Sequence, residues 1–430
     1  MEQLLHYVWK HKLFPLSPLT TTWHQAVEVI DPGLHNRNAG PDFFNAKIKL
    51  NGTLWVGNVE IHDKASDWYV HGHDKDERYD NVILHVCGTI DVEAKNSKGE
   101  PLVQLQLDIP ENVSKHYQEL LSIDQYPPCY QIIPSLTRLT VHSWMSALQT
   151  ERLSQKTDAI EARVKQCNGD WENAYFVTLA RNYGFGINGD AFEQWAYHLP
   201  LRAVDHHRDD LFQIEAIFLG QAGLLELNTI PERYQKDALN DGYFSRLRNE
   251  YLYLSHKFSL QPMDYKQWRF LRLRPQNFPH IRISQLANLY YNRRAGLSQL
   301  LEASTVKEAK QVLSTSVTEY WETHYTFGST SIRNEKHLSP FSLNLLIINT
   351  VVSILFAYGR HRGEEKYCDR AFDFLEELKA ENNHIVRMWK ECGLPVENAG
   401  DSQALIQLKK EYCDRKECLR CRIGYEYLKR

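Results

Sequence analysis

Two acidic residues and a histidine lie close together around a predicted β-hairpin near the N-terminus. Pro41-Asp42 comes first, Asn51-Gly52 is typical of a two-residue type I′ turn, and Glu60-Ile61-His62 follows on the second strand. Because side chains alternate along a strand, Glu60 and His62 point to one face and Ile61 to the other. Carboxylates are the ligands that a hard divalent cation prefers, and a third group then helps a water to attack phosphorus. We therefore expect Asp42 and Glu60 to bind Mg²⁺ or Mn²⁺ as catalytic residues.

This arrangement resembles the PD-(D/E)XK nuclease superfamily, in which a Pro-Asp at a strand start is followed, after a hairpin, by an acidic residue, any residue and a lysine. His62 stands where that family has lysine, and a neutral imidazole does not replace a fixed positive charge. Three alternatives follow. His62 is a ligand or an acid/base, or Lys64 takes the role of the lysine, or the site is inactive. An ordinary hairpin with a buried hydrogen bond between Glu60 and His62 is the structural alternative.

Four further histidines are candidates for the surroundings of this site. His35 lies in the loop that leads to Asp42, and loops entering a strand often line a site. His71 and His73 follow the second strand and could bind phosphate or order a loop. His85 lies on a predicted central strand and could orient Glu60 from behind. Each of them also has a simpler role as a hydrogen-bonded loop or core residue.

Strand patterns are confined to the first quarter of the chain. They predict a short helix at 3–13, strands at 26–30 and 81–87, and a second hairpin joining 89–93 to 103–107. Glu2 and Gln3, at the start of the first helix, are further candidates for the site. From about residue 135 the apolar period becomes helical. We therefore expect an α+β protein with three parts: a restriction-endonuclease-like α/β sheet domain at 1–112, a linker at 113–134, and a large all-α domain at 135–430.

One segment of the helical region, 261–294, is strongly basic. It contains seven lysines and arginines against a single acid, Asp264, and aromatic residues are interleaved with them. Proteins bind single-stranded nucleic acid with arginines that contact the phosphates and aromatic rings that stack on the unpaired bases. The residues that we expect to contact nucleic acid are Arg269, Arg272, Arg274 and Arg282. In the competing interpretation, the rings lie in the hydrophobic core and the arginines form ion pairs with acidic residues elsewhere in the chain.

The C-terminus carries three cysteines in C-x₄-C-x₂-C spacing, Cys413, Cys418 and Cys421. This spacing can place three thiolates on one zinc ion or iron–sulfur cluster. A fourth ligand is required, for which Cys392 is the nearest candidate and Cys129 or a histidine an alternative. Free thiols in a helical tail are the other interpretation.

The composition is that of an ordinary globular protein. The 430 residues are 43% hydrophobic and 24% charged with a net charge of −4, so a nucleic-acid surface must be local. The N-terminus lacks the apolar core of a signal peptide, and no run of 18 apolar residues predicts a membrane span. The longest apolar stretch, 343–358, is interrupted by polar residues and predicts a buried helix. A cytoplasmic location without membrane contact is the expectation.

Stretches spread along the whole chain resemble an uncharacterised bacterial family, domain of unknown function 2851. They are His35-Asn36, Ala39–Phe43, Gly57–His62, Ser66–Trp68, His71–His73, Val82–Val86, Arg274–Pro279, Ser402–Leu408 and the final cysteine run. This resemblance implies no activity, substrate or cofactor, so the chemistry must be inferred from the residues.

The preferred function is metal-dependent hydrolysis of nucleic-acid phosphodiesters, with DNA or RNA, single strands included, as the partner. The alternative is a non-catalytic nucleic-acid- or protein-binding module on a decayed nuclease scaffold, which the missing lysine favours. A third interpretation, a scaffold protein without a nucleic-acid role, predicts that the arginines of 261–294 are scattered or internally paired.

Overall fold

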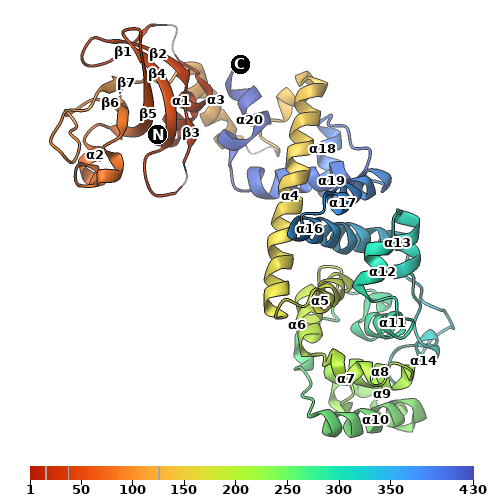
Figure 1. Ribbon diagram of the computed structural model, residues 1–430. Coiled ribbons are helices and arrows are strands. Elements are labelled where there is room, and N and C mark those ends of the chain that lie inside the picture. Colours follow the sequence, from red (N-terminus) through yellow and green to blue (C-terminus); the bar gives the residue numbers. More distant parts are fainter. Residues whose placement is uncertain (15–16, 37, 124–125) are drawn as a thin grey trace. The chain divides into compact units, whose positions relative to one another are not determined.

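The computed structural model describes residues 1–14, 17–36, 38–123 and 126–430 (Figure 1). The chain forms two compact units. Unit 1 comprises residues 1–144, 388–394 and 408–430, and unit 2 comprises residues 145–387 and 395–407. The fold is α+β as expected, with a mixed sheet near the N-terminus followed by a large helical region.

Unit 1 is built around a seven-stranded mixed sheet with the strand order β1-β2-β4-β5-β6-β7, with β3 paired to β4. Its strands are β1 (Leu19–Thr20), β2 (Ala26–Asp31), β3 (Leu34–His35), β4 (Phe43–Leu50), β5 (Thr53–Lys64), β6 (Val82–Thr89) and β7 (Gln104–Gln106). Its other elements are α1 (Glu2–His11), α2 (Asp67–Val70), η1 (His73–Lys75), η2 (Glu77–Tyr79), α3 (Glu111–Ser122), η3 (Tyr130–Ser135), η8 (Leu408–Cys413), η9 (Cys418–Arg420) and α20 (Arg422–Leu428).

The predicted hairpin is confirmed. Strands β4 and β5 pair antiparallel up to Leu50 and Thr53, and the turn residues Asn51 and Gly52 both have positive φ, at 48° and 85°. A type I′ turn requires positive φ at both central positions, which Asn and Gly adopt at low cost. The turn therefore fixes the register that places Glu60 on β5.

The predicted second hairpin is wrong. Strand β7 pairs parallel to β6, and β6 pairs parallel to β5, so two neighbouring strand pairs run in the same direction. The connection from β6 to β7 is long enough for a parallel crossover, which a two-residue turn cannot make. The sheet then curves until its ends meet, where Thr21 bridges Leu105 and the Thr22 amide donates to the Gln104 carbonyl at 2.9 Å. The result is a nearly closed barrel.

Apolar packing holds helix α1 and the loop after β5 against the sheet. Helix α1 packs on β5, and its buried face carries Leu4, Leu5 and Val8 at helical spacing. A small core around Trp68 includes Tyr79, and the Trp68 indole N–H donates to the Lys95 carbonyl at 2.9 Å. This core fixes the loop that carries His71 and His73.

The C-terminal residues return to unit 1. Helix α20 packs on α3 and η3, so the segment 113–134 that was expected as a linker supplies helices to this unit (Figure 1). The ring of Tyr425 lies 4.9 Å from the ring of His11 at the end of α1. The final cysteine run therefore belongs to the same unit as the sheet.

Unit 2 is helical apart from one small two-stranded sheet. Its elements are α5 (Trp171–Tyr183), α6 (Gly189–His198), α7 (Leu201–Asp205), α8 (Leu211–Gln221), η4 (Leu227–Thr229), α9 (Glu232–Asn240), α10 (Gly242–Phe258), η5 (Tyr265–Gln267), η6 (Pro275–Asn277), α11 (Pro279–Tyr291), α12 (Leu297–Glu302), α13 (Val306–Leu313), α14 (Glu319–Glu322), β8 (His324–Thr326), β9 (Ser329–Thr330), α15 (Pro340–Leu346), η7 (Ile347–Val351), α16 (Val352–Arg362), α17 (Glu365–Glu377) and α19 (Ala399–Gln407). Helices α4 (Arg138–Gln166) and α18 (His384–Glu391) cross the boundaries between the units.

The run from α15 to α16 forms part of the core of unit 2. By length and composition alone, Pro340–Arg362 could cross a membrane, yet 61% of its most apolar window is buried inside the protein. Ile347, Val351 and Leu355 are fully buried. The polar residues that interrupt this stretch are consistent with a core helix, as the sequence predicts.

Candidate metal centre

Asp42 and Glu60 lie side by side in unit 1. Asp42 directly precedes β4, and its backbone N–H donates to Oε2 of Glu60 at 2.9 Å. In return, the backbone N–H of Ile61 donates to Oδ2 of Asp42 at 3.0 Å. The two carboxylates are thus fixed by backbone groups of neighbouring strands. A β-bulge between Phe43 and Ala46, where Asn45 has a φ of 55°, shifts the hairpin register by one residue and brings Asp42 level with Glu60. Asp42 is partly exposed, whereas the Glu60 side chain is 6% exposed.

Three histidines gather on the other side of Glu60. Oε1 of Glu60 is 3.3 Å from Nε2 of His73 and 3.7 Å from Nε2 of His62. Nε2 of His62 is also 3.0 Å from Nδ1 of His71. One nitrogen from each of His62, His71 and His73 lies within 4.8 Å of the others, which is close enough for the three to share one metal ion. His85 lies behind them, with its Nε2 2.9 Å from Nδ1 of His62.

Burial keeps the inner histidines neutral. Desolvation, together with the neighbouring histidines, lowers the pKa of His62 to about 2, and desolvation lowers the pKa of His85 to about 4. Desolvation raises the pKa of Glu60, although its contact with His73 acts in the opposite direction. A neutral His62 is able to ligate a metal ion, but it cannot supply the positive charge of the lysine in the PD-(D/E)XK pattern.

Helix α1 contributes a histidine to this site. Nε2 of His6 lies 3.3 Å from Oδ2 of Asp42. Burial alone would lower the pKa of His6, but the contact with Asp42 and the charges of Asp42 and Glu2 outweigh it, so the pKa is raised. His6 is not among the residues that the sequence predicts at this site. Its spacing of four residues from Glu2, a proposed site residue on the same helix, was the available indication.

A cavity of about 570 Å³ opens beside Asp42. One wall comes from α1 and the chain before β4, and the other comes from α3 and the segment 415–420. Its lining residues are Glu2, Gln3, His6, Tyr7, Lys10, His35, Asn36, Asp42, Tyr117, Arg415, Lys416, Glu417, Leu419 and Arg420. Arg415 pairs with Glu411 at 2.9 Å and Arg420 with Glu417 at 3.6 Å, so this wall, which also carries Lys416, has a small excess of positive charge. The cavity therefore contains a carboxylate, a histidine and cationic side chains that could hold a phosphate.

Lys64 lies apart from this cluster. Its side chain is exposed, and its charge acts on Asp91, whose pKa is lowered first by a hydrogen bond from Ser66 and also by Lys64. The strand runs four residues beyond Glu60 before Lys64 is reached. Lys64 therefore does not supply the missing positive charge next to the carboxylates.

The basic segment of unit 2 divides into exposed and buried arginines. Arg269, Arg272 and Arg274 are exposed, and the structure records no carboxylate partner for them among the described residues. Arg282 is 6% exposed, and its guanidinium donates to Asn277 and Gln285 in the core. Most of the interleaved rings pack into unit 2 as well, so stacking of bases on this segment has little support.

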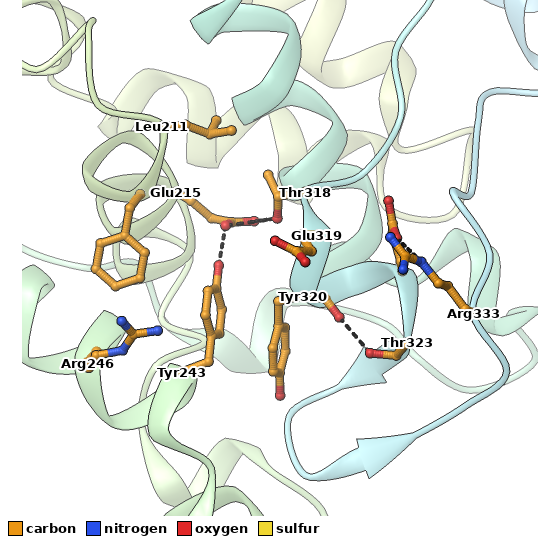
Figure 2. Close-up of a pocket in the computed structure, with 11 residues that line it drawn as sticks. Leu211, Glu215, Tyr243, Arg246, Thr318, Glu319, Tyr320, Thr323 and Arg333 are labelled. Atoms are coloured by element: carbon orange, nitrogen blue, oxygen red, sulfur yellow. Dashed lines mark hydrogen bonds and ion pairs between the residues drawn. The ribbon is translucent and has the colours of Figure 1, made fainter.

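Unit 2 contains a second buried glutamate, beside a cavity of about 560 Å³ (Figure 2). The Glu215 carboxylate accepts hydrogen bonds from the hydroxyls of Tyr243 and Thr318 and, at 2.8 Å, from the indole N–H of Trp321. Every one of these neighbours is a donor. The arrangement satisfies the carboxylate completely and needs no ligand.

The cysteines form a separate group in unit 1. Cys413, Cys418 and Cys421 line one pocket, and the fourth cysteine there is Cys129. Cys392, the candidate nearest in the sequence, does not line this pocket, and only desolvation and Glu391 raise its pKa. The α18–α19 region carries Cys392 elsewhere, whereas η3 brings Cys129 to the C-terminal segment.

The fold and the site define an α+β protein whose barrel-like sheet carries a buried carboxylate–histidine cluster. Residues 2–384 match the family described as Protein of unknown function (DUF2851), so the chain belongs to that family. No curated protein and no solved structure matches the chain.

Proposed function

We propose that unit 1 is a metal-dependent nuclease that hydrolyses phosphodiesters of nucleic acid. The observation that carries this proposal is a continuous chain of close polar contacts from His6 through Asp42 and Glu60 to His73, next to a cavity with a cationic wall. Buried acidic and basic groups with shifted pKa values that gather at a cavity are typical of catalytic sites.

The placement of the carboxylates supports a nuclease of the PD-(D/E)XK type. Pro41-Asp42 precedes β4, the Asn51-Gly52 hairpin follows, and Glu60 lies on β5, in the order found in that superfamily. The departure is His62, which adds a neutral imidazole where the superfamily has an ammonium group. The three histidines lie within 4.8 Å of one another, and Asp42 and Glu60 lie outside that group. We therefore propose that the histidines hold the ion and that Glu60, 3.3 Å from His73, and then Asp42 would turn toward it on binding.

Mn²⁺ fits this donor set better than Mg²⁺ does. Carboxylates suit Mg²⁺ and Mn²⁺ alike, whereas imidazole nitrogens favour transition metals. Glu60 lies between the two groups of possible ligands, with Oε1 3.3 Å from His73 and Oε2 accepting a hydrogen bond from the backbone N–H of Asp42. A divalent ion bound there would lower the pKa of a water and offset charge on the phosphate.

The surrounding residues have separate roles in the proposed reaction. His6, whose pKa is raised, would carry a proton and donate it to the leaving oxygen from the cavity wall. Arg415, Lys416 and Arg420 would hold the phosphate backbone across the cavity. His85 would orient the ring of His62 through their 2.9 Å contact.

Incubation of the full chain with labelled single- and double-stranded DNA and RNA plus Mn²⁺ tests the proposal. Cleavage by the wild type should fall at least ~100-fold in Glu60→Gln, because the substitution removes a ligand charge but keeps the shape. Glu28→Gln is the matched control, since Glu28 is an exposed carboxylate on β2. Cleavage that Glu60→Gln leaves unchanged would refute the assignment.

The second candidate is a non-catalytic module that binds nucleic acid or protein. The neutral His62 at the lysine position favours it, because the charge that this position supplies in active nucleases is missing. This candidate predicts binding that weakens with salt and no cleavage with any of the metal ions. Salt-sensitive binding together with Mn²⁺-dependent cleavage would exclude it.

A further inference from the structure

Four cysteines from distant parts of the chain line one pocket in unit 1. The pocket has a volume of about 250 Å³. Cys129 precedes η3, Cys413 ends η8, Cys418 begins η9, and Cys421 precedes α20. Helix α20 packs on α3 and η3, and this packing brings the C-terminal segment to Cys129.

The four thiols are sheltered from solvent and affect one another. Cys129 and Cys421 are 8% and 7% exposed. Desolvation raises the pKa of Cys129 well above its usual value, and the charges of Cys421, Cys413 and Cys418 raise it further. Thiols packed in this way resist ionisation unless positive charge lies among them, which is what metal binding provides.

Backbone groups are arranged around Cys421 in a way that suits a thiolate. Desolvation raises the pKa of Cys421 to about 11, whereas hydrogen bonds from the amides of Gly424 and Ile423 act to lower it. Gly424 is required there, since a Cβ at this position would lie 2.1 Å from the carbonyl oxygen of Cys418. The start of α20 therefore lies against the Cys418 turn with amide groups directed at sulfur, as outer-shell donors are in metal sites.

The rest of the pocket is mostly apolar. Its other lining residues are Leu120, Leu121, Ile123, Tyr126, Pro128, Tyr412, Lys416 and Gly424. An apolar shell protects a metal–thiolate group from water, and Lys416 supplies a positive charge near an anionic centre. Tyr126 interacts with Cys413 and donates to Asp414 at 3.1 Å.

The four thiols line a cavity of about 250 Å³, which offers more room than a single ion fills. Four sulfurs around one zinc at ~2.3 Å lie roughly 3.8 Å apart and leave no space between them. In the described part of the chain, no three of these sulfurs all lie within 4.8 Å of one another. A cluster with several irons separates its thiolates, because each binds a different iron or edge of the cluster.

From this geometry we infer that Cys129, Cys413, Cys418 and Cys421 hold an iron–sulfur cluster. Four cysteine thiolates are the usual ligand set of such clusters. The cluster would tie η3 to the C-terminal segment and so hold in place the cationic wall of the larger cavity, since Lys416 lines both cavities. This inference does not depend on the proposed nuclease activity.

Metal and sulfide analysis of the full chain, purified without oxygen, tests the inference. The expected result is iron and acid-labile sulfide in equal amounts, with the broad visible absorption of an iron–sulfur cluster that bleaches on reduction or in air. Zinc without sulfide, or no metal at all, would overturn the inference. These measurements need no substrate, so they are independent of the test for cleavage.

Two matched substitutions identify the fourth ligand. Cys129→Ser should lose most of the iron and sulfide, whereas Cys392→Ser should retain the wild-type amounts because Cys392 lies outside the pocket. Equal loss in both variants, or full retention in Cys129→Ser, would contradict the assignment. If Cys129→Ser does not fold, the stoichiometry of the wild type and of Cys392→Ser decides the question.

Discussion

Among the described residues, unit 1 and unit 2 each contain one buried glutamate, and the neighbours of the two carboxylates differ. Glu60 and Glu215 are 5% and 2% exposed. Around Glu215 every neighbour is a hydrogen-bond donor, namely Tyr243, Thr318 and Trp321. Around Glu60, Oε1 faces imidazole nitrogens of His73 and His62, and a second carboxylate lies close by. Burial alone therefore does not mark a functional group.

The two glutamates differ in the chemical character of the groups that contact their carboxylates. The Glu215 network is complete, so it stabilises unit 2 and gives no reason to bind a ligand. The Glu60 cluster is also paired, but its partners are neutral imidazoles, whose ring nitrogens can turn a lone pair toward a cation as hydroxyl and indole donors cannot. The same substitution at the two positions should consequently have different effects.

The largest expected effect is on the stability of unit 2. Glu215→Gln places an amide N–H₂ against hydroxyl and indole donors, so at least two buried polar groups lose their partner. The free energy of unfolding should fall by about 3 kcal/mol. Calorimetry should show a lower melting temperature, by roughly 2–4 °C for each kcal/mol lost.

Glu319→Gln is the control for this experiment, because Glu319 lines the same cavity but is exposed. It should change the free energy of unfolding by less than about 0.5 kcal/mol. Equal and small effects of the two substitutions would mean that the Glu215 network contributes little to stability.

In unit 1, Glu60→Gln should leave the metal-free protein within about 1 kcal/mol of the wild type, since an amide N–H₂ is able to donate to a neutral imidazole. The response to metal should differ. Mn²⁺ at 100 times its dissociation constant should stabilise the wild type by about 2.7 kcal/mol and should not stabilise Glu60→Gln. Thermal unfolding with and without Mn²⁺ measures both quantities.

Glu28→Gln should retain the full stabilisation by Mn²⁺. A shift in melting temperature that persists in Glu60→Gln would place the ion elsewhere. If Mn²⁺ does not raise the melting temperature of the wild type, the cluster is not a metal centre. Glu60 and Glu215 would then differ only in how their side chains are packed.

Local pattern in the sequence accounts for much of unit 1. The alternating runs and the Asn51-Gly52 turn predict β4 and β5 in the observed register as far as Ala46 and Gly57, and the first helix and β6 also lie where the periodicity predicts them. The turn residues fix strand direction over short distances. The turn therefore brings Asp42 close to β5, and the β-bulge between Phe43 and Ala46, which the alternation does not predict, brings it level with Glu60.

The remainder depends on contacts between residues far apart in the sequence. The alternation of 103–107 indicates a strand but not its partner, so the parallel pairing of β7 with β6 was missed. The return of the C-terminus to α3 has no local pattern either. For this reason the cationic wall at 415–420 was not foreseen, and Cys392 was preferred over Cys129 as the nearest cysteine in the chain.

Mild acid should destabilise both units through histidines that are buried in the neutral form. The folded pKa values of His62, His85 and His280 are about 2, 4 and 3, below the ordinary 6.5. The unfolded chain therefore binds more protons below pH 6.5, and stability falls as the pH is lowered through that value. Between pH 7.5 and 6.0 each such histidine should contribute a loss of up to about 1 kcal/mol.

Denaturant unfolding at the two pH values measures this loss. His85→Gln should reduce the pH dependence of the free energy of unfolding of unit 1, and His280→Gln should reduce that of unit 2. Each reduction should equal the contribution of one histidine. A pH dependence that neither substitution changes would show that these histidines do not control it.

The smallest expected effect concerns the exposed arginines of unit 2. If they hold nucleic acid while unit 1 cleaves it, Arg274→Glu should weaken binding a few-fold without changing the Mn²⁺ response of unit 1. The reason is that a surface arginine contributes one released counterion, so the slope of log K against log salt should fall by about 0.7–0.9. Lys307→Glu, an exposed charge reversal on α13, is the control and should leave the slope unchanged. Equal slopes for the wild type and Arg274→Glu would mean that the basic segment does not contact nucleic acid, and recognition would then rest on the cationic wall of unit 1.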